Sequence, residues 1–193
     1  RLLTLVDGGV QNVAAFGDEI VNLGNNFAAT EKEILSNAEA IAQNTGIYRF
    51  GRQDVLAYAT ATKAVGLEAE VVGSTFSRTL GTFGKFISTG KNVDAILKVV
   101  GGSASELSAR FKTDASGVFL DYVRGLNKVH SAGGDVNATM RATGIVAVRD
   151  QRVIASLASN GYAVLEDAMN KVREASGALD QEFQTKAGSL ERQ

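Results

Sequence analysis

Apolar side chains recur at helical spacing most persistently in the stretch from Ala57 to Gly90. Steps of four, four, three and four residues place one set on a single helical stripe, namely Val72, Phe76, Leu80, Phe83 and Ile87. Small residues lie between them: Gly73, Ser74, Thr79, Gly81 and Gly84. We therefore expect a second helix to approach this one closely on the adjoining face.

A Gly-Leu-Glu-Ala corner, Gly66 to Ala69, leads into that helix. Glycine commonly ends a helix, so Gly66 is expected to end the preceding helix from Gln53 to Val65. Glu68 and Glu70 bring negative charge to the start of the next helix, where the helix dipole favours it. The preceding helix is expected to turn Val55, Leu56, Ala59 and Thr62 inward.

The chain before this corner predicts two helices. The first runs from Val10 to Leu23 and ends at Gly24-Asn25-Asn26. Thr30 and Glu33 form a capping box for the second, which ends near Thr45-Gly46. The inward residues are Val13, Phe16, Ile20 and Leu23, then Ile34, Ala38, Ile41 and Ala42. Ile47 to Phe50 is expected to be a short linker with strand-like residues.

After the central stretch, glycines and capping residues divide the pattern into short helices. Asn92 is expected to cap the first, and Gly101-Gly102 to end it. Ser103 and Glu106 form a second capping box. The remaining elements are a helix from Asp114 to His130, a break at Gly133-Gly134, a short helix between Asp135 and Gly144, a helix from Val148 to Ala158, and a turn at Asn160-Gly161.

From Tyr162 onward the pattern changes to a weak heptad seam in a segment rich in Glu, Lys, Gln and Arg. The seam residues are Leu165, Met169, Val172, Ser176, Leu179, Phe183 and Leu190, interrupted at Lys186. A helix from Leu165 to Leu190 would be about 39 Å long. Two interpretations stand equal on these residues: a terminal helix packed on its own bundle, or the start of a longer rod.

Composition supports an all-α chain: a multi-helix bundle of Gly-separated short helices with a longer, coiled-coil-like C-terminal helix. The 193 residues include no proline, which would interrupt helices, and 21 glycines, which divide the pattern. A net charge of −1 argues against a large nucleic-acid-binding surface. We expect a helical core region over 1–160 and a long helix over 161–193. Because the chain opens with Arg1 rather than Met, we also expect it to be part of a longer polypeptide.

Four pieces of the chain together resemble the core region of phage tail tape measure proteins. They are the corner Gly66 to Ala69, the segment Leu97 to Asp114 (L..VVGG.S..E...F..D), the apolar helix Val118 to Leu126, and the Gly-Gly turn with a short helix from Ala132 to Ile145. Their order and spacing, over roughly residues 25–175, carry the resemblance.

The resemblance implies a structural protein of a phage or prophage tail. Such a protein occupies the lumen of the tail tube, sets the tail length because a helix has a fixed rise per residue, and leaves ahead of the DNA. It implies self-association and contacts with tail tube subunits, assembly chaperones and tail-tip proteins. The expected location is the virion tail lumen, with the host cytoplasm during assembly. The resemblance also favours the longer rod as the interpretation of the C-terminal helix, although we expect the rest of this chain to be compact.

No residue set predicts catalysis, cofactor binding or metal binding, so we expect no enzyme. The only histidine, His130, is expected to be a surface or capping residue. Gly84-Lys85 and Gly90-Lys91 lack the spacing of a phosphate-binding loop, and we interpret them as helix breaks with solvated lysines. Glu68 and Glu70 point to different faces. Arg78, Lys85 and Lys91 are too sparse for a nucleic-acid track.

The alternative function is a helical membrane-active or protein-binding module of a secreted effector. The membrane-active form requires an exposed face of Phe76, Phe83 and Phe86 that enters lipid. The chain shows no apolar run long enough to span a bilayer.

Overall fold

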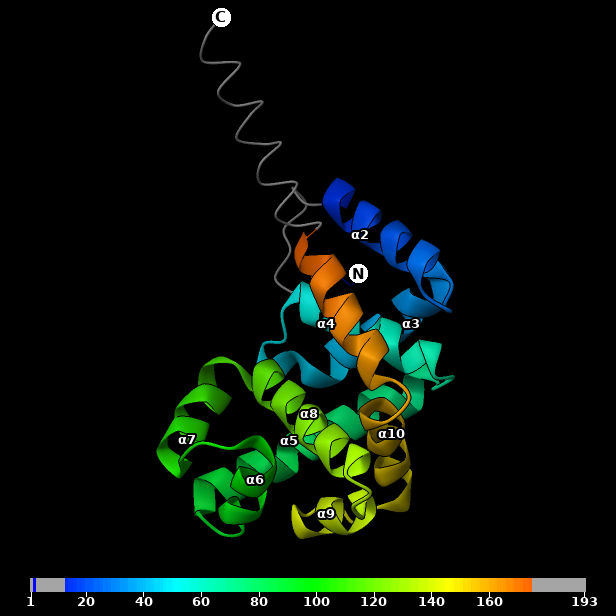
Figure 1. Cartoon of the computed structure of the whole chain (residues 1–193). Helices are drawn as coiled ribbons and strands as arrows, with labels where there is room; N and C mark the ends of the chain where they lie inside the picture. The colour runs from blue at the N-terminus through cyan, green and yellow to red at the C-terminus, as the bar shows by residue number, and fades with distance from the viewer. Residues whose placement is uncertain (1, 3–12, 175–193) are drawn as a thin grey trace, which may run out of the picture.

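The computed structural model describes residues 2 and 13–174, and the described residues form helices and turns without strands. The all-α prediction is therefore confirmed. In chain order (Figure 1), the helices are α2 (Val13–Asn26), α3 (Glu31–Thr45), the 3₁₀ turn η2 (Gly46–Tyr48), α4 (Arg52–Ala64), α5 (Ala69–Thr89), α6 (Val93–Val100), α7 (Ala104–Thr113), α8 (Ala115–Ser131), α9 (Val136–Ala142) and α10 (Val148–Ala158). Residues 162–174 are helical as well.

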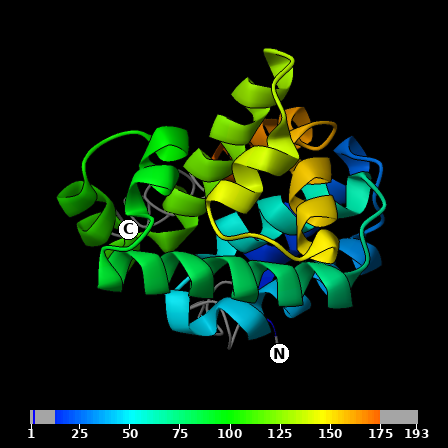
Figure 2. The same cartoon turned by 90° about the horizontal axis from the view of Figure 1, so that it is seen from below.

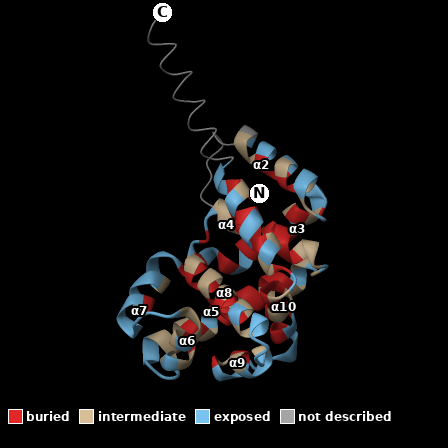
Figure 3. Ribbon diagram, in the orientation of Figure 1, coloured by how far each residue is buried: buried red, intermediate tan, exposed pale blue. Residues whose placement is uncertain are grey.

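Helix α4 lies at the centre of the core. Every residue from Val55 to Thr62 is buried, as expected for a helix enclosed on all sides. Its Tyr58 ring packs against Phe76 of α5 and Phe119 of α8, with ring centroids 5.2 and 5.5 Å apart. Aromatic side chains thus join three helices that are distant in sequence. The buried residues of these helices and of α3 and α10 face one another (Figure 3).

The predicted stripe of the long helix α5 faces this core. Val72, Phe76, Leu80 and Phe83 are fully buried, and Ile87 is partly buried near the helix end. The predicted close approach on the adjoining face occurs at Gly73. A β-carbon at Gly73 would lie 2.6 Å from the carbonyl oxygen of Ala40 in α3, so only glycine lets the two backbones meet there.

The corner between α4 and α5 is held by a buried amide. Gly66 has φ +78°, which the turn requires and which glycine adopts without strain. Asn37 of α3 donates hydrogen bonds to the Thr62 hydroxyl and to the Leu67 carbonyl, at 3.0 and 3.2 Å. The corner therefore serves the packing of α3, α4 and α5.

Several predicted helix boundaries are confirmed by their caps. Both capping boxes are present, Thr30 with Glu33 before α3 and Ser103 with Glu106 before α7. Asp135 accepts a hydrogen bond from the amide of Ala138 at the start of α9. Helix α10 has the predicted bounds, Val148–Ala158.

The other local predictions have mixed outcomes. Helix α2 ends at Asn26, within the predicted stop Gly24-Asn25-Asn26. Asn92 precedes α6 but makes no capping hydrogen bond, since it adopts a left-handed conformation with φ 57°. Residues 47–50 do form the predicted short linker between α3 and α4, but its backbone is not strand-like: it includes the end of η2 and a left-handed Arg49, with Ile47 exposed and Phe50 buried.

The described part of the C-terminal segment packs on the bundle. Leu165, Ala168, Met169 and Val172 are buried in the same core as the other helices. The seam residues Ser176, Leu179, Phe183 and Leu190 and the Lys186 interruption lie outside the described residues. The division of the chain near residue 160 and the rod beyond it stay predictions.

Candidate functional site

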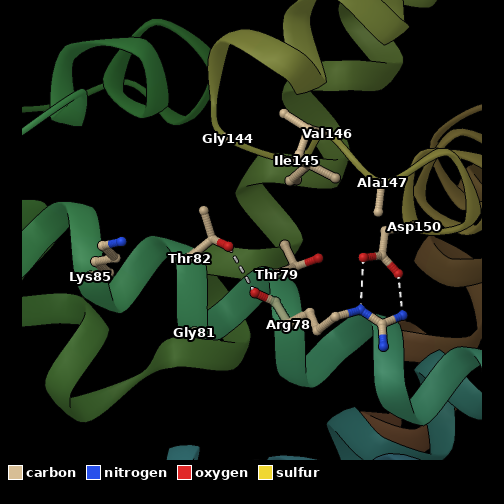
Figure 4. A pocket seen from close by; sticks show the side chains of 10 residues that line it. All are labelled: Arg78, Thr79, Gly81, Thr82, Lys85, Gly144, Ile145, Val146, Ala147 and Asp150. Carbon is tan, nitrogen blue, oxygen red and sulfur yellow. Dashed lines mark hydrogen bonds and ion pairs between the residues drawn. The ribbon is translucent and has the colours of Figure 1, made fainter.

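A buried carboxylate joins α5 to α10. Asp150, in the first turn of α10, is 4 % exposed. The guanidinium of Arg78 donates to both of its oxygens (Figure 4), with Nε 2.8 Å from Oδ2. The Thr75 hydroxyl donates to Oδ1 at 2.8 Å. Burial alone would raise the pKa of Asp150, but the hydrogen bonds from Arg78 and Thr75 outweigh it and hold the pKa below its usual value.

The segment before α10 lies alongside α5 (Figure 2). Gly144, with φ +85°, packs so tightly on α5 that a β-carbon there would lie 2.7 Å from the Phe86 ring. Gln151, also buried, donates from Nε2 to the carbonyl of Ile145 at 2.7 Å. These contacts and the Asp150 ion pair fix the segment at both ends.

A hollow of about 360 Å³ lies between this segment and α5. Its lining is shown in Figure 4: Arg78, Thr79, Gly81, Thr82, Lys85, Gly144, Ile145, Val146, Ala147 and Asp150. The Thr79 hydroxyl is buried without a hydrogen-bond partner among the described residues. The side chain of Lys85 is exposed at the rim.

The side chains that line the hollow provide charge and a concave surface, and they do not form a group suited to proton transfer. The only carboxylate in the lining, Asp150, is neutralised by Arg78, and no histidine or cysteine lines the hollow. Within residues 13–174, no three His, Cys, Asp or Glu side chains come together as metal ligands. The hollow therefore combines a largely apolar lining with one exposed lysine, Lys85, at its edge.

The residues that the sequence analysis considered for chemistry do not lie together in the fold. His130 is exposed in the last turn of α8, as predicted. Glu68 occupies the N-cap position of α5 and pairs with Lys63 at 3.1 Å, while Glu70 lies in the first turn. Neither glutamate approaches the hollow's lining.

The glycine and lysine pairs do not form a loop. Gly84 lies inside α5, facing the Phe111 ring of α7, so its interpretation as a helix break is wrong. Gly90, with φ +68°, ends α5 as expected. Lys85 and Lys91 are exposed, but Arg78 is engaged by Asp150 rather than lying free on a solvated face.

The exposed phenylalanine face that the membrane-active alternative requires is absent. Phe76 and Phe83 are fully buried and Phe86 is partly buried, because the apolar stripe of α5 faces the core. None of the helices within the described residues combines the length and apolar character needed to cross a bilayer.

Asp150 and Thr75 are not among the candidate residues that the sequence pattern indicated. A signal was present: Asp150 precedes Val153, Ile154 and Leu157 by three, four and seven residues, which places it on the inward stripe of α10. A carboxylate at such a position requires a buried cationic or hydroxyl partner. The sequence alone does not indicate which of the 20 basic residues supplies it.

A second buried ion pair joins α2 to α4. Glu19 is 1 % exposed and accepts a hydrogen bond from Arg52 at 2.8 Å. Burial raises the pKa of Glu19 despite the opposing effect of Arg52. This pair fixes the position of α2 and lies away from the hollow.

Comparisons of the chain with protein-family models, with curated proteins and with solved structures give no match.

Proposed function

We propose that this chain is the core region of a phage or prophage tail tape measure protein, a structural component that acts through shape and length. The observation that carries the proposal is the ordered set of four motif pieces in the sequence. The way these pieces pack in the fold supports it.

The corner at Gly66 is tied to α3 by Asn37. The segment Leu97–Asp114 supplies the end of α6 and all of α7, and both helices contact α8. Gly125, within the third piece, lies directly against the Val99 carbonyl in the second. The fourth piece ends in the Gly144 turn against α5. The residues that carry the resemblance thus serve the packing of one core.

The proposed mechanism is geometric. Short, Gly-separated helices form a compact core region, and a coiled-coil-like C-terminal helix continues as a rod whose residue count sets a distance. The proposed surroundings are the tail tube lumen in the virion and the host cytoplasm during assembly. The proposed partners are further copies of this chain, tail tube subunits, assembly chaperones and tail-tip proteins. No catalytic step, cofactor or metal belongs to the proposal.

The test is genetic, with tails examined by electron microscopy. Disrupting the gene that encodes this chain is expected to abolish tails or broaden their length distribution. Gly125→Leu, which forces a large side chain into the contact between α6 and α8, is expected to do the same. Gly17→Ala changes a glycine with open space around it and is expected to leave tail length unchanged. Normal tails after disruption of the gene would contradict the proposal.

A further inference from the structure

Two hollows follow one another along the same side of α5. The first is the one between α5 and residues 144–147. The second, about 540 Å³, is lined by Leu67, Val71, Val148, Arg149, Arg152 and Val153. Residues 144–153 run past α5 in the opposite direction (Figure 2). Accordingly, Gly144 contacts Phe86 near the end of α5, while Asp150 binds Thr75 and Arg78 closer to its start. The two hollows therefore lie end to end along α5, with the Asp150–Arg78 ion pair between them, and together we call them the α5/α10 groove.

The groove exposes apolar side chains in an otherwise well-covered molecule. Val146 and Val148 are 70 % and 67 % exposed, and one lines each hollow. They belong to a small set of large apolar side chains that solvent reaches, the others in the described part of the chain being Val13, Val21 and Ile47. Neighbouring Leu67, Val71 and Val153 extend the apolar floor. Two exposed valines in one groove favour a partner with an apolar stripe.

Cationic side chains outnumber carboxylates in the lining of the groove. Arg78, Lys85, Arg149 and Arg152 line the two hollows, against a single carboxylate, Asp150, which Arg78 and Thr75 already satisfy. Within residues 13–174, Lys85, Arg149 and Arg152 take part in no ion pair. The chain as a whole carries a net charge of −1, so this face is more positively charged than the chain average.

We propose that the α5/α10 groove binds an acidic amphipathic helix of a partner protein. The apolar stripe of that helix covers Val146 and Val148, and its carboxylates meet Lys85, Arg149 and Arg152. Val71 and Lys85 are about 21 Å apart along α5, so about four turns of a bound helix span the groove. This inference is independent of the proposed role in a phage tail.

Other occupants fit less well. A second copy joined by a two-fold axis through this face would bring the same cations against one another, which is repulsive. Single-stranded nucleic acid is bound through base stacking on aromatic side chains, and none of the residues lining either hollow is aromatic. An apolar floor with cations at the rim matches the two faces of an acidic helix.

The probe is a fluorescein-labelled helical peptide of about 20 residues, with Leu on one face and Glu on the others. Fluorescence anisotropy with the purified chain is expected to show saturable binding that weakens as salt is raised. A peptide with Lys replacing every Glu, and a scrambled peptide of the same composition, are expected to bind at least tenfold more weakly. Equal binding of the three peptides, or no binding of the acidic peptide, would overturn the proposal.

Two variants locate the binding. Arg149→Glu with Arg152→Glu is expected to weaken binding at least tenfold. The control, Lys112→Glu with Lys128→Glu, makes the same change in net charge on α7 and α8 and is expected to change binding less than twofold. Val148→Ser, which leaves the charge unaltered, is expected to weaken binding severalfold because it removes apolar contact. If the control pair weakens binding as much as the groove pair does, the binding is non-specific and the proposal fails.

Two further measurements separate the other occupants. Light scattering after size exclusion is expected to give the same mass for the wild-type chain and the groove double variant. A dimer that only the wild-type chain forms would assign the groove to a second copy. Single-stranded DNA that binds more tightly than the acidic peptide, and is lost in the same double variant, would assign it to nucleic acid. Either result would overturn the proposal.

Discussion

Gly125 shows how a single residue determines a helix–helix distance in this protein. Its position in α8 lets the helix contact the backbone of Val99 in α6, and a β-carbon there would overlap the Val99 carbonyl oxygen. Gly73 has the same role between α5 and α3, where the nearest atom is also a backbone carbonyl. A backbone obstacle cannot rotate away as a side chain can, so each glycine is fixed by the packing around it.

Gly125→Ala is therefore expected to destabilise the fold by about 1–3 kcal/mol, because α6 and α8 must move apart. Urea unfolding followed by circular dichroism measures the change. Gly17→Ala is the control: it lies in α2 with nothing within 4 Å of the new methyl group, and it is expected to stabilise the chain by about 0.5–1 kcal/mol. Equal effects of the two variants would contradict the packing role of Gly125.

Asp150 is a second residue whose role can be measured, through pH. Its pKa is lowered in the folded chain, chiefly because the hydrogen bonds from Arg78 and Thr75 outweigh the effect of burial. The stabilisation is thus fully present above the unfolded pKa of about 3.9 and is lost as pH falls through the lower folded value. Asp150→Asn is expected to cost about 1–2 kcal/mol at neutral pH. The difference from wild type should shrink below about pH 4.

Unfolding free energies of the wild-type chain and of Asp150→Asn, measured from about pH 7 to pH 3, provide this test. Asp18→Asn, an exposed change in α2, is the control and is expected to stay within about 0.5 kcal/mol of wild type throughout. A gap between wild type and Asp150→Asn that is constant across this range would mean that the ion pair does not stabilise the fold.

Among the elements, those with local capping signals could be predicted and those determined by distant contacts could not. The capping boxes at Thr30 and Ser103 need only residues within one turn, so sequence was sufficient for them. The Gly24-Asn25-Asn26 stop is local as well, and α2 ends within it, at Asn26. In the candidate site, the inward place of Asp150 follows from the spacing within α10. Its pairing with Arg78 does not, because it joins residues 72 positions apart.

The cap of α7 gives a prediction about an element. Ser103→Ala removes the hydroxyl that accepts a hydrogen bond from the Glu106 amide and donates one to the Glu106 carboxylate, while the backbone N–H of residue 103 still donates to that carboxylate. The expected cost is about 1 kcal/mol in the free energy of unfolding. Ser108→Ala, in the same helix, removes a hydroxyl that makes no hydrogen bond within the described residues, and is expected to change stability by less than about 0.5 kcal/mol. If the two changes cost the same, the capping box contributes nothing.

Over the residues that the structure describes, the chain is a helical core whose surface includes the cationic, apolar α5/α10 groove. Rings from α4, α5 and α8 meet at its centre, and α6 and α7 lie on the side away from α2 in both views (Figures 1 and 2). Nearly every feature that the sequence made conspicuous serves packing: the Gly66 corner, the stripe of α5 and the close glycines. A protein that acts through shape and length, as proposed, needs such residues for packing rather than for catalysis.

Mass spectrometry of tail particles tests that role most directly. Particles purified from cells that express the gene are compared before and after their DNA is released. We predict peptides of this chain in intact particles, in a fixed ratio to the tail tube subunit, and their loss once the tails are empty. Intact tails that lack these peptides, or emptied tails that keep them in full, would contradict the proposed function.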